Sequence, residues 1–284
     1  MKPAIFFRSK RGLAIPIVIF TIFFSTLWAI IAPVWISIGN SNPIQTITHA
    51  LLDNLEFKKT AGEYFVTQMK KDASGAELAI LKKKGSQIST AVTDQLSTPE
   101  FMTNLDLATS QIYNYYVLGS LEAKTVSVRP IAMEVFKAFT KVDPQFKRLQ
   151  NEIDRIKPID LKRDPNVPDL KKIHSLLTLA FTVNSALIFI LLLSYLFAAR
   201  SKNGFFRTTG IIFLNIGAID IAVRAIGVAI ANDKIKTITN ELAKVAAPIV
   251  LTEITKPLLT LGILFLLLGA LGVGLSFMSK NPQN

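Results

Sequence analysis

Three polar residues, Asn215, Asp220 and Arg224, lie well inside the apolar stretch 205–231. Asp220 and Arg224 are four residues apart, so a helix places them on one face. Ionisable side chains inside a membrane are costly, and they usually face a bundle interior or an aqueous cavity. The pattern is typical of a self-paired structural couple, with Arg224 reaching the outer headgroups, or of a polar path or gate. We favour the structural couple and keep the three residues as a candidate intramembrane polar site.

A run of three cations, Lys82, Lys83 and Lys84, is the second candidate site. Such a run can contact anionic lipid headgroups or wall polymers, and it can also form the solvated face of a helix. We favour the solvated face and keep the three lysines as a candidate surface basic cluster.

Residues that carry catalysis or hold metals are scarce. The chain has no cysteine, which excludes disulfides, thiolate catalysis and cysteine-based zinc sites. Neither His49 nor His174 has a carboxylate or a second histidine at metal-ligand spacing. No nucleophile-elbow, phosphate-loop, dinucleotide-binding or zinc-protease motif occurs. We therefore predict no catalytic residue, no metal site, no cofactor and no enzymatic activity.

Hydrophobicity defines the elements that must position these residues. Half of the 284 residues are hydrophobic, only 18% are charged, and the mean hydropathy is +0.40. This composition excludes intrinsic disorder and disfavours a purely soluble protein. A bilayer core needs about 20 apolar residues in a helix. Segments of that length predict transmembrane helices at 13–38, 174–199, 205–231 and 257–277.

The cations outside these segments predict the orientation. Eight Lys and Arg residues lie in the N-terminus 1–12, the loop 200–207 and the tail 278–284, against four between the last two spans. This bias places both termini in the cytoplasm, as a multi-pass protein of a bacterial inner membrane. The first span is longer than the apolar core of a signal peptide, so we predict an uncleaved signal-anchor. Because cations cluster at helix ends, the net charge of +12 indicates a lipid bilayer rather than nucleic acid as partner.

The segment 39–172 has the chemistry of a soluble domain, with 19 Lys and Arg against 16 Asp and Glu. Its apolar residues recur at helical spacing, which predicts a helical domain outside the cytoplasm. The alternating stretches 124–128 and 158–161 predict a small two-stranded β element. The fold class is therefore an all-α membrane protein with four transmembrane helices, a mostly helical extracytoplasmic domain and this β element.

The segment 232–255 joins the last two spans and has its own apolar stripe, from Ile235 to Ile249. The spacing predicts an amphipathic helix at the outer interface or packed beneath the helical domain. We favour packing beneath that domain, because both lie on the same side of the membrane.

The layout resembles a set of uncharacterised, mainly actinobacterial, four-span integral membrane proteins. Three features carry the resemblance: the helix openings Glu56-Phe57 and Glu100-Phe101, the turn Val126-Ser127-Val128-Arg129-Pro130, and the stretch Pro158-Ile159-Asp160-Leu161 leading to Asp169-Leu170. It covers nearly the whole chain and implies no assigned activity.

The order of one span, a large outer domain and three further spans also resembles transporter permeases of the macrolide-exporter and cell-division class. Those permeases grip an ATPase through a cytoplasmic segment between spans two and three. In this chain that link is only about residues 200–207, which departs from their pattern.

Together these features predict a non-catalytic membrane protein whose outer domain binds, senses or organises envelope components, with envelope proteins or anionic lipids and polymers as partners. The alternative is a transport or channel component, permease-like, with a polar path at Asn215, Asp220 and Arg224. Neither hypothesis fixes the oligomeric state.

Overall fold

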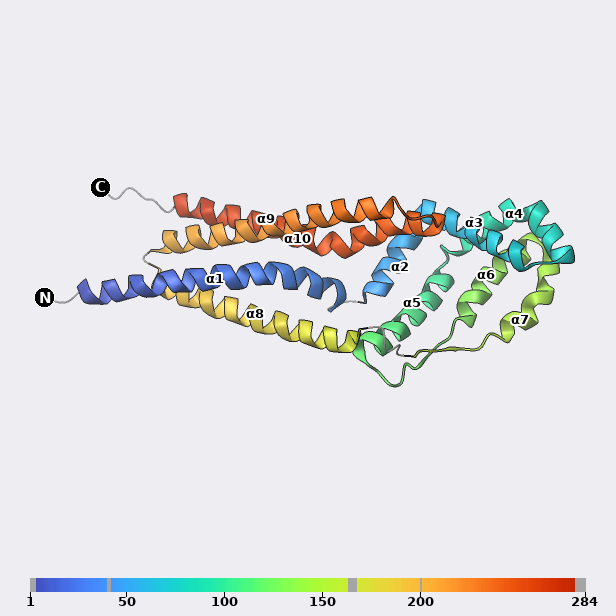
Figure 1. The fold of residues 1–284 in the computed structure, drawn as a ribbon, viewed down its shortest axis with the longest axis horizontal. Helices are drawn as coiled ribbons and strands as arrows, with labels where there is room; N and C mark the ends of the chain where they lie inside the picture. The colour runs from blue at the N-terminus through green and yellow to red at the C-terminus, as the bar shows by residue number, and fades with distance from the viewer. Residues whose placement is uncertain (1–3, 40–41, 163–167, 200, 279–284) are drawn as a thin grey trace. The chain divides into compact units, whose positions relative to one another are not determined.

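The structure is a computed structural model that describes residues 4–39, 42–162, 168–199 and 201–278, with side chains described between residues 14 and 277 (Figure 1). The described chain is almost entirely helical and divides into two compact units. The span unit comprises Met1–Ser41, His174–Ile230 and Thr255–Asn284, and the helical domain comprises Asn42–Ile173 and Ala231–Ile254.

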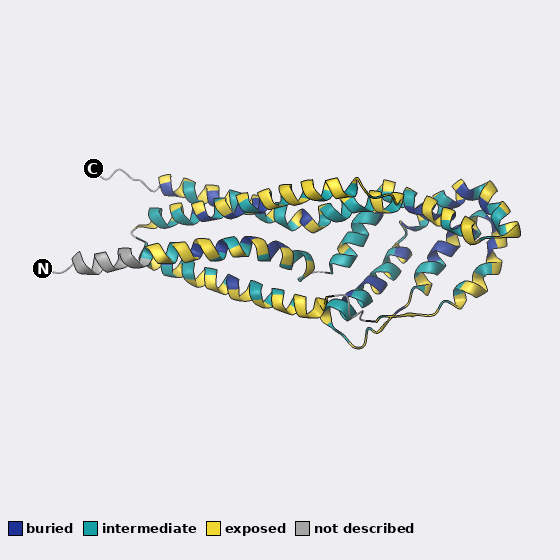
Figure 2. Ribbon diagram, in the orientation of Figure 1, coloured by how far each residue is buried: buried dark blue, intermediate teal, exposed yellow. Residues whose placement is uncertain are grey.

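Four long helices carry the apolar segments: α1 (Ala4–Ile38), α8 (Leu170–Ala198), α9 (Lys202–Ile235) and α10 (Glu241–Met278). Each contains a segment long and apolar enough to cross a membrane, as the sequence predicts. Many of their apolar side chains are exposed, with Phe197 reaching 79% (Figure 2). Exposed apolar surface on this scale is unfavourable in water and is normal against lipid.

Glycines bring α9 and α10 into direct backbone contact. A Cβ atom added at Gly217 would lie 2.5 Å from the carbonyl oxygen of Gly262, and one at Gly210 would lie 2.8 Å from that of Gly269. The two glycines of each helix are seven residues apart, which is two helical turns, so they lie on one face. Small residues of this kind allow close helix packing in lipid, so intrachain packing accounts for these glycines.

Aromatic residues join α1 to α8. The rings of Trp35 and Phe181 are stacked, with their centroids 4.1 Å apart. Trp35 Nε1 also donates to Thr178 Oγ1 at 3.3 Å, and Trp28 Nε1 donates to Ser185 Oγ at 2.9 Å. Both indole N–H groups therefore have partners inside the span unit, as polar groups in an apolar medium require.

Short helices form most of the helical domain. In chain order they are α2 (Pro43–Asp53), α3 (Leu55–Asp72), α4 (Gly75–Gln95), α5 (Pro99–Tyr113), the π-helix η1 (Asn114–Leu118), α6 (Arg129–Val142), the 3₁₀ helix η2 (Pro144–Leu149) and α7 (Gln150–Asp154).

Capping side chains start several of these helices. The Asn42 side chain accepts from the backbone N–H of Gln45, and Asp143 accepts from that of Gln145, as expected for residues that precede a proline. Ser97 and Thr98 both precede α5, and only one of them is its N-cap. Thr98 is the cap and accepts from the Phe101 N–H, because Pro99 occupies the first helical position.

The predicted β element is confirmed. Strand β1 (Thr125–Val126) pairs antiparallel with β2 (Ile159–Asp160), with Thr125 opposite Asp160 and Val126 opposite Ile159. A further backbone hydrogen bond runs from the Leu161 N–H to the Lys124 carbonyl at 2.8 Å. The ribbon holds together the two ends of the segment that contains α6, η2 and α7.

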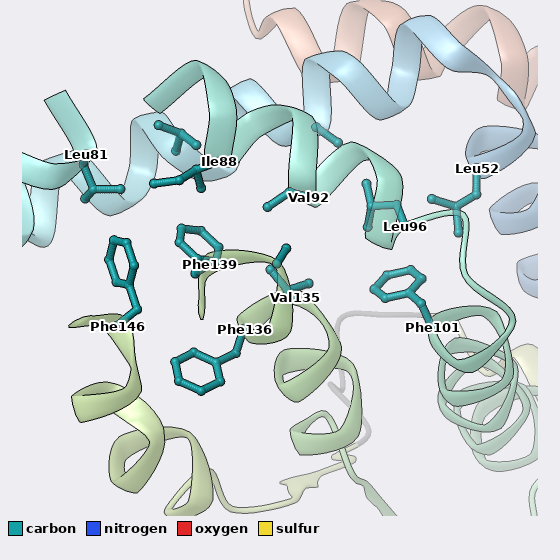
Figure 3. Packing of buried hydrophobic residues seen from close by; sticks show 13 residues of the cluster. Leu52, Leu81, Ile88, Val92, Leu96, Phe101, Val135, Phe136, Phe139 and Phe146 are labelled. Atoms are coloured by element: carbon teal, nitrogen blue, oxygen red, sulfur yellow. The ribbon is translucent and has the colours of Figure 1, made fainter. Parts of the chain in front are cut away.

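The core of the helical domain lies along one face of α4. Its residues Leu81, Ile88 and Val92 have no exposed surface, which confirms the apolar stripe predicted for this segment. Phe139 and Phe146 face them from α6 and η2, with ring centroids 5.4 Å apart in an edge-to-face arrangement (Figure 3). Close packing of branched and aromatic side chains takes the place of disulfides.

The connection between α9 and α10 differs from the separate amphipathic helix predicted over 232–255. Helix α9 continues to Ile235, a turn follows, and α10 runs from Glu241 into the last span without a break. Pro248 and Pro257 lie inside α10 and do not end it, so the helix continues from the amphipathic segment into the span. Leu242 packs against the core of the helical domain, in agreement with the favoured position of this segment.

The glycine contact predicts a strong effect of side-chain size. Gly217→Val is expected to lower the stability of the span unit by about 1–3 kcal/mol, because a side chain must displace the α10 backbone. The measurement is thermal unfolding of the full-length protein in detergent. Gly227→Val is the matched control, since an added Cβ there meets nothing within 4 Å. Equal destabilisation by both variants would contradict the close contact.

Candidate functional site

An apolar groove of about 570 Å³ lies in the helical domain between α3, α6 and the η2–α7 segment. Twelve of its thirteen lining residues are apolar, and Glu152 is the exception. Phe65 and Met69 line it from α3, while Val135 and Phe136 line it from α6. A volume of this size is within the range of about 300–1,000 Å³ typical of small-molecule sites.

The floor of the groove belongs to the core. Phe139 and Phe146, which pack against α4, also line the groove, whereas Phe65 at its edge is 41% exposed. The groove is therefore open to solvent at Phe65, while its aromatic lining offers water no hydrogen-bond partner. Water in such a cavity has few partners, so an apolar ligand displaces it favourably.

Cations follow one end of the groove. Val128 and Ile156 line that end, and the exposed residues Arg129, Arg155 and Lys157 adjoin them in sequence. The Arg129 guanidinium donates to the Asp154 carbonyl oxygen at 3.4 Å, which places it beside the end of α7. Two carboxylates, Glu152 and Asp154, are also present at this end, so the cations are in excess by one.

The three lysines of the predicted basic cluster have different environments. Lys82 and Lys83 are exposed, whereas the ammonium of Lys84 lies 3.0 Å from Asp143 Oδ2. Hydrogen bonds from the backbone N–H of Gln145 and from Lys84 hold the pKa of Asp143 below its ordinary value of 3.8. The structure thus uses Lys84 to fix α4 to the start of η2, and it leaves two lysines free of this contact.

The two histidines each have a partner that the sequence does not reveal. His49 Nε2 on α2 lies 2.6 Å from Asp106 Oδ1 on α5, and His174 Nε2 lies 2.9 Å from the Gly39 carbonyl oxygen. Residues 49 and 106 are far apart in sequence, so only the fold brings them together. In the described part of the chain, no group of three or more metal-ligating side chains forms.

A second, polar groove of about 630 Å³ follows the α3–α4 contact. Its charged residues are mixed in sign, with Lys59 and Lys70 against Glu63 and Asp94. Balanced charges of this kind are typical of a solvated helix pair and do not select a ligand of one sign.

The intramembrane candidates do not share one surface. Asp220 has no exposed surface, Arg224 is half-buried, and Asn215 is exposed on α9. The self-paired couple expected from the sequence is not formed, because neither carboxylate oxygen of Asp220 has a hydrogen-bond partner. The helix brings Asp220 and Arg224 within one turn of each other and places Asn215 elsewhere, since five residues correspond to about 140° of rotation.

Burial also affects Tyr113 at the end of α5. The side chain is 8% exposed, and burial raises the pKa of its phenol above the ordinary value of 10.0. Tyr113 therefore stays neutral at physiological pH and contributes packing.

Comparisons of the chain with protein-family models, curated proteins and solved structures give no match. The class of this protein therefore has to be inferred from its structure. Four apolar helices of membrane-spanning length identify a multi-pass membrane protein, and the chain also forms a compact helical domain.

The contact between Asp143 and Lys84 predicts a pH-dependent contribution to stability. Because the pKa of Asp143 is lowered by folding, its carboxylate stabilises the domain above the ordinary pKa, and this contribution is lost as the pH falls through the folded-state pKa. Asp143→Asn is expected to lower the thermal midpoint at neutral pH and to narrow its difference from the wild type below about pH 4.

Far-UV circular dichroism of the full-length protein in detergent measures these midpoints. Asp72→Asn, at an exposed carboxylate at the end of α3, is the control. A constant difference between wild type and Asp143→Asn across this pH range would show that the ion pair has no such role.

Proposed function

We propose that this protein is a non-catalytic inner-membrane protein that displays its helical domain outside the cytoplasm and binds an acyl chain of an envelope amphiphile there. The apolar groove between α3, α6 and α7 is the observation that carries the proposal. The sequence led us to expect a domain that binds, senses or organises envelope components, and the proposal names the component that it binds.

The lining of the groove supports an apolar ligand. Its walls offer methyl, methylene and aromatic groups, so a ligand gains by burying apolar surface, at about 25 cal/mol per Å². A polar ligand would lose its hydration and find only the Glu152 carboxylate as a polar side chain. The same lining supports a non-catalytic role, because acid–base catalysis needs positioned titratable groups around a reacting atom.

Two observations favour a lipid as the source of that acyl chain. The span unit has the dimensions and apolar surface of a membrane-embedded protein, so lipid is the most abundant apolar molecule near it. Arg129, Arg155 and Lys157 at one end of the groove complement an anionic headgroup. An acyl chain in the groove, with its charged end beside these cations, would match both the apolar lining and the excess positive charge.

The transport alternative remains a hypothesis. A transport path would require Asn215, Asp220 and Arg224 to line one continuous surface. In the structure, Asn215 is exposed and Asp220 is completely buried. No observation on these three residues favours it over the acyl-chain site. Bacterial origin and membership of the set of four-span proteins are likewise part of the proposal.

Binding is testable with a fluorescent fatty acid, cis-parinaric acid, and the full-length protein in lipid nanodiscs. Phe65→Ser is expected to weaken binding by about tenfold or more, because it removes an apolar wall. Tyr64→Ser is the matched control: Tyr64 is the preceding residue on α3 with nearly the same exposure, 39% against 41%, and does not line the groove.

A second variant tests the site in the opposite way. Ala132→Phe adds apolar volume inside the groove and is expected to block binding without making the wall polar. Wild-type affinity in both groove variants, or an equal loss in Tyr64→Ser, would refute the acyl-chain site.

The orientation is testable because the chain contains no cysteine, so a single introduced thiol reports its own position. Lys82→Cys, exposed on α4, is expected to react with a membrane-impermeant maleimide in intact cells. Ser201→Cys, exposed before α9, is expected to react only after the cells are permeabilised. Reaction of both thiols in intact cells, or of neither, would contradict the proposed topology.

A further inference from the structure

Asp220 is the one described residue within the four predicted spans that combines an acidic side chain with complete burial. It has no exposed surface, and neither of its carboxylate oxygens has a hydrogen-bond partner. This position is distinct from the groove of the helical domain and has no part in the function proposed above.

The α10 backbone packs closely against α9 at Asp220. A Cβ atom added at Gly262 would lie 3.2 Å from Asp220 Cβ, and one at Gly217 would meet the Gly262 carbonyl oxygen. One turn earlier on the same face of α9, Ile216 packs in a cluster with Ala29 of α1. Helix backbones and apolar side chains therefore enclose this part of α9.

Charged residues are few on the helices that pack against this part of α9. Arg224 follows on α9, and α1 has no charged residue between Ala14 and Ile38. On α10 the nearest charged positions in sequence are Lys256 and Glu253, six and nine residues before Gly262. Arg224 is thus the only cation of α9 within one turn of Asp220.

Arg224 is within reach of Asp220 and does not pair with it. Residues four apart on a helix are neighbours, yet no ion pair joins the two side chains, and the buried Nε of Arg224 has no hydrogen-bond partner. An ionised carboxylate in apolar surroundings would require that pair. Its absence fits a carboxyl group that is neutral, with a proton on one oxygen.

We propose that Asp220 is an intramembrane proton-binding site, which releases its proton to water when the α9–α10 contact at Gly262 opens and Arg224 turns to pair with the carboxylate. In this step the carboxyl O–H bond breaks, the proton passes to water, and the electron pair stays on the oxygen. The guanidinium then compensates the new negative charge. Proton release and helix separation are coupled, because in the packed interface no donor pairs with an ionised Asp220 carboxylate.

The proton is testable with dicyclohexylcarbodiimide, an apolar reagent that attacks protonated carboxyl groups in membranes. The carboxyl proton moves to a carbodiimide nitrogen as the oxygen adds to the central carbon, and acyl migration then leaves a stable N-acylurea. The full-length protein in lipid nanodiscs is treated, digested and analysed by mass spectrometry. Asp220 is expected to be labelled at about pH 6 and at least about tenfold less at about pH 9.

Asp233 is an internal control on the same helix, because it is 76% exposed and pairs with Lys236 at 2.9 Å. It is expected to stay unlabelled. Arg224→Gln removes the compensating cation, so labelling of Asp220 is expected to persist at about pH 9. Three outcomes would overturn the proton site: no adduct on Asp220 at about pH 6, equal adduct yields at both pH values, or labelling of Asp233 equal to that of Asp220. All three are measured on the wild-type protein.

Hydrogen–deuterium exchange tests the coupling to helix separation. After correction for the intrinsic pH dependence, peptides spanning residues 214–224 are expected to exchange faster at about pH 9 in the wild type and not in Asp220→Asn. The asparagine is neutral at both pH values and has nearly the same shape. Unchanged exchange in the wild type, or the same increase in Asp220→Asn, overturns the coupling.

Discussion

The structure depends on one constraint: in an apolar medium, a polar group finds partners only within the chain. Most backbone groups of the four long helices are paired within the helices, and several of their hydroxyl groups follow the same rule, whereas the buried hydroxyl of Thr209 on α9 has no partner. Thr21, Thr26 and Thr182 each donate to the carbonyl oxygen four residues earlier. The indoles of Trp28 and Trp35 find hydroxyl partners on α8. Among the buried polar groups of these helices that have no partner, Asp220 is the acidic one, and both of its oxygens are unpartnered, so its charge state needs a chemical explanation.

The constraint on the helical domain is different. Its polar groups can hydrogen-bond to water, but without cysteine it must be held together by its apolar core. Helix α4 has a central role, with Leu81, Ile88 and Val92 packed against residues of α6 and η2 (Figure 3). The groove lies where α3, α6 and α7 enclose apolar surface without filling it. The Lys84–Asp143 contact, the β ribbon and the caps hold the surrounding segments in place.

Features set by local pattern were predictable from the sequence. Span length, the stripe on α4 and the alternating stretches that form the ribbon depend on neighbouring residues, so their spacing indicates them. The groove and the His49–Asp106 contact depend on how distant segments meet, which no local period encodes. For Asp220 and Arg224 the spacing indicates a shared face but not side-chain direction, and the expected pair is absent. The seven-residue glycine spacing in both α9 and α10 was a usable signal for their contact.

The glycine contact between α9 and α10 also limits how this chain can evolve. In most cores, enlargement of one residue is offset by a smaller residue opposite. In this interface the positions opposite Gly210 and Gly217 are themselves glycines, Gly269 and Gly262, and no smaller residue exists. A side chain at Gly210 or Gly217 meets backbone atoms of α10 first. A substitution at either position therefore has no compensating change in a facing side chain, and natural variation should be confined to other positions of the two helices.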